Sequence, residues 1–238
     1  MNKVPELSVF FPFWNEEGNA ESVVRKAIPV LEKVALKWEI IMVDDGSSDK
    51  TLEIISKLAK SDPRLIVAAH QKNRGYGAAL KTGFSSAKYN VIVFNDGDGQ
   101  FDFSEVTKFL ERIENADFVI GYRKKRLDNP LRHILMKLLK IWDFIFFRFR
   151  FKDIDCGFKM IKKPALEKIL PFKSEGAMIT TEILAKAKKA HLKLTEVEVH
   201  HYPRVYGAQS GGNLRVILRA VIESLLLWKD LTFKYGRN

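Results

Sequence analysis

Cysteine is nearly absent from this sequence: Cys156 is the single one in 238 residues. One thiol cannot form a disulfide within the chain, so a disulfide-stapled extracellular scaffold is excluded and a reducing compartment is expected. Internal repeats, low-complexity tracts and linkers rich in Pro, Gly or Ser are also missing, and 46% of the residues are apolar. The chain is therefore expected to form one globular domain over residues 1–238, and not a disordered or fibrous protein.

Long apolar runs are missing too. The most apolar stretch, residues 138–147, is interrupted by Lys140 and Asp143, and it falls short of the roughly 18 residues that a bilayer-spanning helix requires. No basic segment followed by an apolar core opens the chain, so we expect no secretory signal. Any contact with a membrane is therefore expected to be made from its surface.

Acidic residues are too few to balance the basic ones, and the formal net charge is +11. The excess is concentrated in residues 123–173, where 15 side chains are basic and 5 are acidic. Such a segment indicates a polyanionic partner, which is nucleic acid, an anionic membrane or a phosphorylated substrate.

Strand-like and helix-like segments alternate along the chain. Short, near-continuous apolar runs separated by segments with helical spacing predict an α/β fold, in which a mostly parallel, Rossmann-like sheet is flanked by helices. The predicted strands cover residues 7–12, 38–43, 64–69, 90–94, 117–120, 158–161 and 193–199. Helices are expected over residues 17–36, up to 60, after 77, from about 104 and over 178–191, with amphipathic helices over 130–151 and towards residue 238.

Polar residues follow each of the first four predicted strands. In open parallel sheets, ligands bind beyond the carboxyl ends of the strands, so these positions are expected to form the site. The polar segments are residues 12–16, 44–47, 73–77 and 95–100.

Asp96, Asp98 and Gln100 alternate along the last of these segments and therefore share one side of an extended chain. Such oxygens suit Mg²⁺ or Mn²⁺, which take one or two carboxylates and complete their shell with water and substrate phosphates. The alternative is a simple turn, because Asp and Gly both favour turns. The neighbouring polar strand ends favour the metal site.

Asp44 and Asp45 are adjacent, so their side chains point to opposite sides and only one of them can cap the next helix. The other is expected to accept hydrogen bonds from a base or a ribose. Between Gly75 and Gly77, either the backbone approaches a ligand or a helix simply begins.

Seven motifs succeed one another between residues 7 and 212: PFWNE at 12–16, VDDGS at 43–47, NRG at 73–75, DGDGQ at 96–100, GYR at 121–123, DxxCGF at 153–158 and RxxG at 204–207. In order and spacing they resemble the family 2 glycosyltransferases with a GT-A fold. Within that family the chain is most similar to the polyprenol-phosphate (dolichol-phosphate) mannose or glucose synthases. An ordered series is far more specific than any single motif.

The resemblance implies roles for individual positions. Asp96, Asp98 and Gln100 match residues that hold the metal and the diphosphate, and Arg123 and Arg132 match residues near the sugar-phosphate or the acceptor phosphate. Arg204 lies in the loop that closes over the donor, and Asp98, Arg123 and Arg204 are the expected catalytic residues. The other positions expected to contact the nucleotide-sugar are Pro12, Trp14, Asn15, Glu16, Val43, Asp44, Asp45, Gly75, Gly97 and Ser210.

One position departs from the family pattern. The family loop usually reads Arg-x-x-Gly-x-Ser-Lys, and Ser210 stands where the lysine is expected. Either Arg215 substitutes for that cation or the donor is held differently.

The expected function is metal-dependent, inverting transfer of a hexose from a GDP- or UDP-hexose to a polyprenyl phosphate. A lipid monophosphate is mostly a dianion at neutral pH, so it attacks without a general base but requires cations to bind it. By the resemblance, residues 1–122 bind the nucleotide-sugar and residues 123–238 face the acceptor and the membrane.

Two alternatives remain open. In the first, the acceptor is a hydroxyl of a glycan or polysaccharide, and Asp153 or Asp155 is the base. In the second, the chain is a non-catalytic module that binds membrane or nucleic acid. The Asp96-x-Asp98-x-Gln100 motif argues against this module, and aromatic and basic residues at helical spacing argue against a nucleic-acid partner.

Residues 134–150 interleave aromatic and aliphatic side chains with Lys and Arg. A helix of this kind either lies in the lipid headgroup region or packs on the core with a solvated basic face. We expect a peripheral protein at the cytoplasmic face of a membrane, with a separate membrane-anchoring protein as a further partner.

Overall fold

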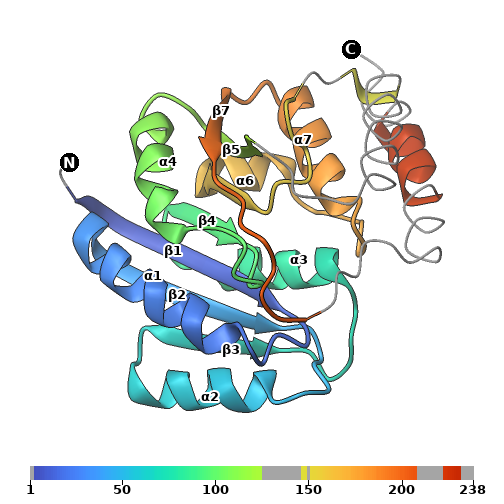
Figure 1. Cartoon of the computed structure of the whole chain (residues 1–238). Coiled ribbons are helices and arrows are strands. Elements are labelled where there is room, and N and C mark those ends of the chain that lie inside the picture. The colour runs from blue at the N-terminus through green and yellow to red at the C-terminus, as the bar shows by residue number, and fades with distance from the viewer. Residues whose placement is uncertain (1–2, 125–145, 149–150, 208–221, 232–238) are drawn as a thin grey trace.

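The computed structural model describes residues 3–124, 146–148, 151–207 and 222–231. Seven strands form one sheet in the order β3-β2-β1-β4-β6-β5-β7 (Figure 1). The strands are β1 (Val4–Phe13), β2 (Ala35–Asp44), β3 (Leu65–Ala69), β4 (Val91–Asn95), β5 (Phe118–Arg123), β6 (Phe158–Lys162) and β7 (Leu194–Val199).

Helices connect most of the strands. They are α1 (Ala20–Val34), α2 (Thr51–Ser61), α3 (Tyr76–Ser86), the 3₁₀ turn η1 (Phe103–Glu105), α4 (Val106–Ile113), α6 (Lys163–Ile169) and α7 (Ile179–Lys189). Residues 222–231 are also helical. In α1 the buried residues recur every three or four positions, which gives the helix one apolar stripe to place on the sheet.

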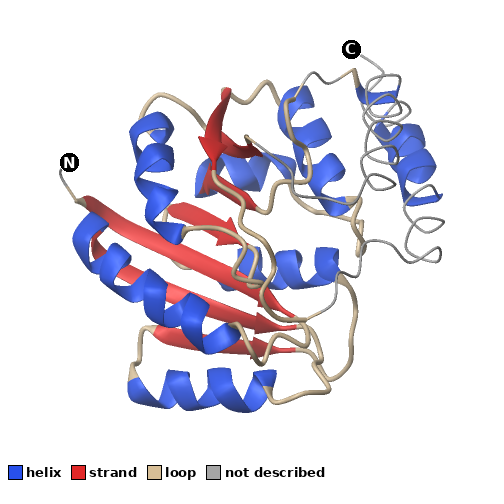
Figure 2. Ribbon diagram, in the orientation of Figure 1, coloured by secondary structure: helices blue, strands red, loops and turns tan. Residues whose placement is uncertain are grey.

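The helices cover both faces of the sheet (Figure 2). Buried side chains of α1, α2 and α4 form one core with residues such as Phe11 and Met42. Those of α3, α6 and α7 form a second core with Phe10 and Ile41 on the opposite face. Strand residues are apolar on both faces because a parallel sheet in three layers leaves neither face to water.

The pairing is parallel except at β6, which is antiparallel to both β4 and β5. Although β6 comes after β5 in the chain, it lies between β4 and β5. Residues before and after position 122 therefore interleave in the same sheet.

The predicted α/β class is confirmed, and all seven strands overlap the predicted segments, although β1 begins at Val4 and β2 begins at Ala35, inside the range that was predicted helical. The first helix begins at Ala20 and not at residue 17, because the N–H groups of Asn19 and Ala20 both donate to the carbonyl of Glu16 in a preceding turn. The short helix α6 was not predicted. The amphipathic helix expected over 130–151 lies mostly outside the described residues.

Candidate active site

The carboxyl ends of the parallel strands β1–β4 meet at one edge of the sheet. The register places Phe13 of β1 beside Asp44, and Asp44 of β2 beside Ala69, while Phe10 pairs with Phe94 of β4. The arrowheads of β1, β2 and β3 end together in Figure 1. The loops over residues 14–19, 45–50, 70–75 and 96–102 follow these ends, so the predicted convergence of polar strand ends is confirmed.

Asn15 and Glu16 join the loop after β1 to the loop after β2. Asn15 has a φ of 54°, in the left-handed region that Asn tolerates better than most residues. Its Oδ1 accepts the Ser48 N–H at 2.8 Å, and the Glu16 N–H donates to Thr51 Oγ1 at 2.8 Å. The two loops are therefore fixed against each other.

Trp14, Pro12 and Val43 lie where β1 and β2 end. Pro12 and Val43 are register partners, and Val43 is fully buried. Trp14 is 45% exposed, so its indole presents a flat apolar surface of the kind on which a nucleotide base stacks.

Asp44 is completely buried. Its Oδ2 accepts the N–H groups of Gly46 and Ser47, both at 3.1 Å, whereas its Oδ1 has no hydrogen-bond partner among the described residues. A buried carboxylate oxygen without a partner is costly, and a ligand N–H would satisfy it. Neither Asp44 nor its neighbour caps α2, whose first N–H, that of Thr51, donates to Asp49 at 2.9 Å.

Asp45 uses both of its oxygens to hold the loop after β3. Its Oδ1 lies 2.6 Å from His70 Nδ1 and accepts the Arg74 N–H at 3.0 Å. Its Oδ2 accepts the Gly75 N–H at 2.8 Å. Of the two adjacent aspartates, Asp44 is therefore the one that keeps a buried carboxylate oxygen without a hydrogen-bond partner among the described residues.

Tyr76, the first residue of α3, reaches the candidate metal site. Its hydroxyl donates to Asp96 Oδ1 at 2.8 Å. Burial and the Asp96 carboxylate raise the pKa of Tyr76 well above its usual value, so the phenol remains a donor. Sequence reasoning missed this role, for which the signal was a hydroxyl-bearing aromatic between Gly75 and Gly77.

Asp96 is held from two sides. Its N–H donates to the Gly157 carbonyl at 3.0 Å, and a Cβ at Gly157 would lie 1.9 Å from Asp96 Oδ2. Only glycine fits there, which explains the glycine in the CGF motif. Burial raises the pKa of Asp96, although the Tyr76 hydrogen bond and the Lys159 charge act in the opposite direction.

Asp98 lies two residues further on, and its Oδ1 accepts the Gln100 N–H at 3.1 Å. Burial and the charge of Asp96 raise the pKa of Asp98 to about 7. Gly97, between Asp96 and Asp98, lies so close to Phe13 that a Cβ on Gly97 would be 2.4 Å from the Phe13 ring. Gln100 donates its amide to the Tyr202 carbonyl at 2.9 Å and so joins this loop to the one after β7.

Asp96 and Asp98 fit a divalent cation. Two neighbouring carboxylates with raised pKa values repel each other when ionised, and a bound cation relieves that repulsion. No cluster of three or more His, Cys, Asp or Glu side chains in the described ranges is arranged to hold a metal. A site with two carboxylates instead suits Mg²⁺ or Mn²⁺ completed by substrate phosphates.

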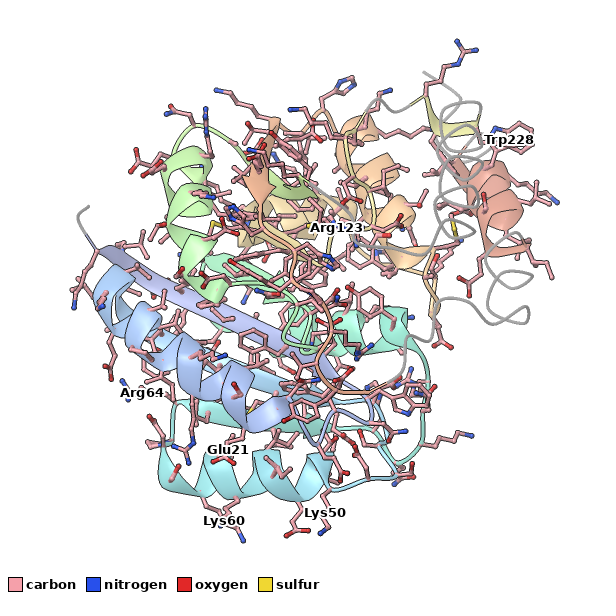
Figure 3. The ribbon with its side chains drawn as sticks, viewed as in Figure 1. Glu21, Lys50, Lys60, Arg64, Arg123 and Trp228 are labelled. Carbon is pink, nitrogen blue, oxygen red and sulfur yellow. The ribbon has the colours of Figure 1, made fainter. Side chains whose placement is uncertain are left out.

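Arg123, at the end of β5, forms a two-pronged ion pair with Asp153, and Figure 3 labels Arg123 near the middle of the molecule. Nε lies 2.6 Å from Oδ2 and Nη2 lies 2.9 Å from Oδ1, with the side chains only 7% and 5% exposed. Burial opposes the charged guanidinium, but the hydrogen bonds and charge of Asp153 raise the pKa of Arg123 above its usual value. The structure thus pairs this predicted phosphate ligand with an internal carboxylate.

Lys159 of β6 is a second buried cation that sequence reasoning missed. It is 0% exposed, its Nζ donates to the Cys156 carbonyl, and it lies 5.4 Å from the centroid of the Phe94 ring. Burial lowers the pKa of Lys159, whereas the charges of Asp153 and other carboxylates act to raise it. In the sequence it looked like any lysine of a basic segment.

Arg204 pairs with Glu16, although the two are far apart in the sequence. Arg204 Nε also donates to the Tyr206 carbonyl at 2.8 Å. The Tyr206 ring covers Gly18, where a Cβ would lie 2.7 Å from Tyr206 Cγ. The loop after β7 therefore crosses the loop after β1, and it brings together two of the predicted site residues.

Three of the cations and polar residues discussed from sequence are not placed by the structure. Arg132, Ser210 and Arg215 lie outside the described residues, as does the basic stretch over 125–145.

Comparison with known proteins decides the family. The family model described as glycosyl transferase family 2 matches residues 8–170, more than half of the chain. The chain belongs to glycosyl transferase family 2. It is therefore a glycosyltransferase, as the motifs indicated.

Curated relatives of this family 2 glycosyltransferase are named for lipid-phosphate acceptors. The chain is 30% identical to a dolichyl-phosphate beta-glucosyltransferase of Saccharomyces cerevisiae, over 94% of the chain and 72% of the relative. It is 26% identical to an undecaprenyl-phosphate 4-deoxy-4-formamido-L-arabinose transferase of Salmonella choleraesuis, over 90% of the chain and 65% of the relative. The chain thus spans about two thirds of that second relative.

Solved structures confirm the predicted GT-A fold. Glucosyl-3-phosphoglycerate synthase from Mycobacterium tuberculosis, in complex with Mn²⁺, UDP and glucosyl-3-phosphoglycerate, has a TM-score of 0.69 at 20% identity, covering 94% of this chain and 80% of that one. Mannosyl-3-phosphoglycerate synthase from Rubrobacter xylanophilus has a TM-score of 0.69 at 15% identity, covering 98% and 76%.

Binding of Mn²⁺ with UDP or GDP is expected to depend on pH near neutrality. The pKa of Asp98 is about 7, and only the deprotonated carboxylate binds a metal, so affinity should fall as the pH drops below that value. One unit below it, the affinity should be about tenfold weaker than on the alkaline plateau. Calorimetric titration across this range measures the profile, and a constant affinity through neutral pH would contradict a role for Asp98.

Proposed function

We propose that this glycosyltransferase moves a hexose from a UDP- or GDP-hexose to a polyprenyl phosphate, with inversion at the anomeric carbon. The observation that carries the proposal is the 30% identity, over 94% of the chain, to a yeast enzyme named for a dolichyl-phosphate acceptor. The Salmonella relatives, named for undecaprenyl phosphate, support the same acceptor class. Structures of the mycobacterial synthase with UDP and Mn²⁺ or Mg²⁺ support the nucleotide and the metal.

The donor is bound at the carboxyl edge of the sheet. Trp14 offers a face to the base, and the free Oδ1 of Asp44 accepts one of its N–H groups. Asp96 and Asp98 hold Mg²⁺ or Mn²⁺, which when bound stabilises the negative charge of the departing nucleoside diphosphate. Arg204 holds a donor phosphate after leaving Glu16, because phosphate is a competing anion for the same guanidinium.

An oxygen of the acceptor phosphate attacks the anomeric carbon, the bond from that carbon to the nucleoside diphosphate breaks, and the sugar inverts. The phosphate dianion needs no proton removed, so no general base is required. Both oxygens of Asp153 are held by Arg123, which makes Asp153 unsuited to be the base of a hydroxyl acceptor. Asp155 is then the remaining candidate for the general base in the hydroxyl alternative.

A transfer assay tests the proposal. The chain is incubated with a panel of UDP- and GDP-hexoses, Mn²⁺ or Mg²⁺, and either a short polyprenyl phosphate or the matching polyprenol. We expect transfer to the phosphate alone, lost in EDTA and retained in Asp155→Asn. Transfer to the polyprenol, abolished in Asp155→Asn, would establish the hydroxyl mechanism instead.

Residues 123–238 are proposed to face the acceptor at the cytoplasmic side of a membrane, where a separate anchoring protein would be a partner. None of the helices that the structure describes is long and apolar enough to cross a bilayer. In the helix over 222–231, Leu227 and Leu231 are buried, while Ile222 and Leu226 on the other side are 59% and 61% exposed. A helix that is apolar on its exposed side supports contact with a membrane or protein surface.

This surface is testable by sedimentation with anionic vesicles. Leu226→Asp should reduce the bound fraction severalfold, because a charge in the lipid interface opposes burial of the apolar face. Leu36→Asp is the matched control, since Leu36 is also an exposed leucine, at 70%, and lies at the amino end of β2. Equal binding of both variants and the wild type would show that this helix does not contact the membrane.

A further inference from the structure

Glu182 of α7 is a buried carboxylate that no step above uses. It is 0% exposed, and its oxygens accept the N–H groups of Lys173 at 2.9 Å and Ser174 at 2.7 Å. Lys186 Nζ lies 2.6 Å from the same carboxylate. Although burial acts in the opposite direction, the hydrogen bonds from Lys186 and the two backbone groups hold the pKa of Glu182 below its usual value. Glu182 therefore fixes the segment over 170–178, here called the strap, which connects α6 to α7.

The other side of the strap contacts the first turn of α3. The Glu175 carbonyl accepts the N–H groups of Gly77 at 2.8 Å and Ala78 at 3.3 Å, which are groups that a helix leaves unsatisfied at its start. The Glu175 carboxylate lies 3.4 Å from Arg74 and 3.6 Å from Lys81. Packing is close, because a Cβ at Gly77 would lie 2.8 Å from the Glu175 carbonyl carbon.

This first turn carries Tyr76, whose hydroxyl donates to Asp96 at 2.8 Å. A continuous series of contacts thus runs from Glu182 through the strap and the start of α3 to the candidate metal site. We propose that Glu182 is a positioning residue of that site, which holds the strap against α3 and thereby keeps Tyr76 on Asp96. The inference rests on the proposed function only in assigning the metal and diphosphate to Asp96 and Asp98.

The nature of the contact favours positioning over general stabilisation. A buried carboxylate and lysine are costly to desolvate, and well-packed apolar residues of similar volume commonly serve stability as well or better. What an apolar residue would not do is accept two N–H groups of the strap. Tyr76 is the group in direct contact with Asp96, and the loss of such a contact to a metal ligand typically changes metal affinity or activity by about 10–100-fold.

The test compares Glu182→Gln with Glu39→Gln. Glu39 is a matched control because it is also buried, at 5% exposure, and accepts Ser8 Oγ at 2.6 Å and the Lys88 N–H at 2.7 Å, away from the carboxyl edge. Calorimetry measures affinity for Mn²⁺ with UDP or GDP, and hydrogen exchange measures protection of the Gly77 and Ala78 amides. We expect Glu182→Gln to weaken binding by about tenfold or more and to reduce protection of these amides, with Glu39→Gln close to wild type in both.

Gly77→Ala alters the same contact from the α3 side. It keeps the proposal testable if the Glu182 variant does not fold. Alanine favours a helix over glycine, but its methyl group would press on the Glu175 backbone, so binding should weaken as in Glu182→Gln. Wild-type binding in Glu182→Gln or in a folded Gly77→Ala, or an equal loss in Glu39→Gln, would overturn the proposal. No acceptor enters these measurements, so a wild-type chain that binds the diphosphate but transfers no sugar to a polyprenyl phosphate would refute the proposed function alone.

Discussion

Replacing Asp98 with asparagine is expected to lower kcat/KM for sugar transfer by about a thousandfold, the scale on which charge stabilisation at a reacting centre is lost. Asparagine keeps the side-chain shape, and its Oδ1 can still accept the Gln100 N–H that Asp98 accepts at 3.1 Å. The substitution removes the charge, and with it the carboxylate that is nearest to Asp96 along the loop after β4. Steady-state transfer with Mn²⁺, together with nucleotide binding in the presence and absence of Mn²⁺, measures the effect.

Asp102→Asn is the matched control for this variant. Asp102 lies in the same loop, is exposed, and its Oδ1 accepts the Ser104 N–H at 2.9 Å at the start of η1. Its replacement should leave transfer within a few-fold of wild type, since a cap contributes about 1 kcal/mol to stability and nothing to the metal. Asp98→Asn with unimpaired, EDTA-sensitive transfer would show that another residue holds the metal.

The position of the strand ends that form the candidate site was predictable because it depends on local pattern. Apolar runs such as residues 38–43 are long enough for buried strands, and the polar residues that follow them, such as Asp44 and Asp96, must lie at the carboxyl edge once the strands are parallel. Only the alternation of strands and helices is needed for that step. The same reasoning placed all seven strands.

The partners of the site residues were not predictable, because they are set by contacts between distant segments. The antiparallel insertion of β6 between β4 and β5 brings Gly157 against Asp96, and no spacing in the sequence announces that pairing. The strap contact at Glu175 orients Tyr76 in the same long-range way. Likewise, only the fold shows that Asp45 is used by the loop after β3 while Asp44 keeps a free oxygen.

Removing the carboxylate beside Arg123 is expected to have the largest effect on stability. Asp153→Asn would leave the guanidinium buried at 7% exposure without its counter-charge, and breaking one side of a buried ion pair costs about 3–5 kcal/mol of unfolding free energy. Urea unfolding followed by tryptophan fluorescence measures this loss. The result also bears on mechanism. If Asp153 serves only to neutralise Arg123, its replacement should lower the stability of the protein more than it lowers the rate of transfer to the acceptor.

The double variant Arg123→Met, Asp153→Leu separates the two roles. Removing both charges together leaves no uncompensated ion, so the stability lost in Asp153→Asn should be largely restored in the double variant. A general base at Asp153 predicts the reverse pattern: Asp153→Asn would unfold at the wild-type urea concentration yet lose transfer to a hydroxyl acceptor. Because both oxygens of Asp153 accept hydrogen bonds from Arg123, we expect the loss of stability, and a phosphate acceptor that attacks without its help.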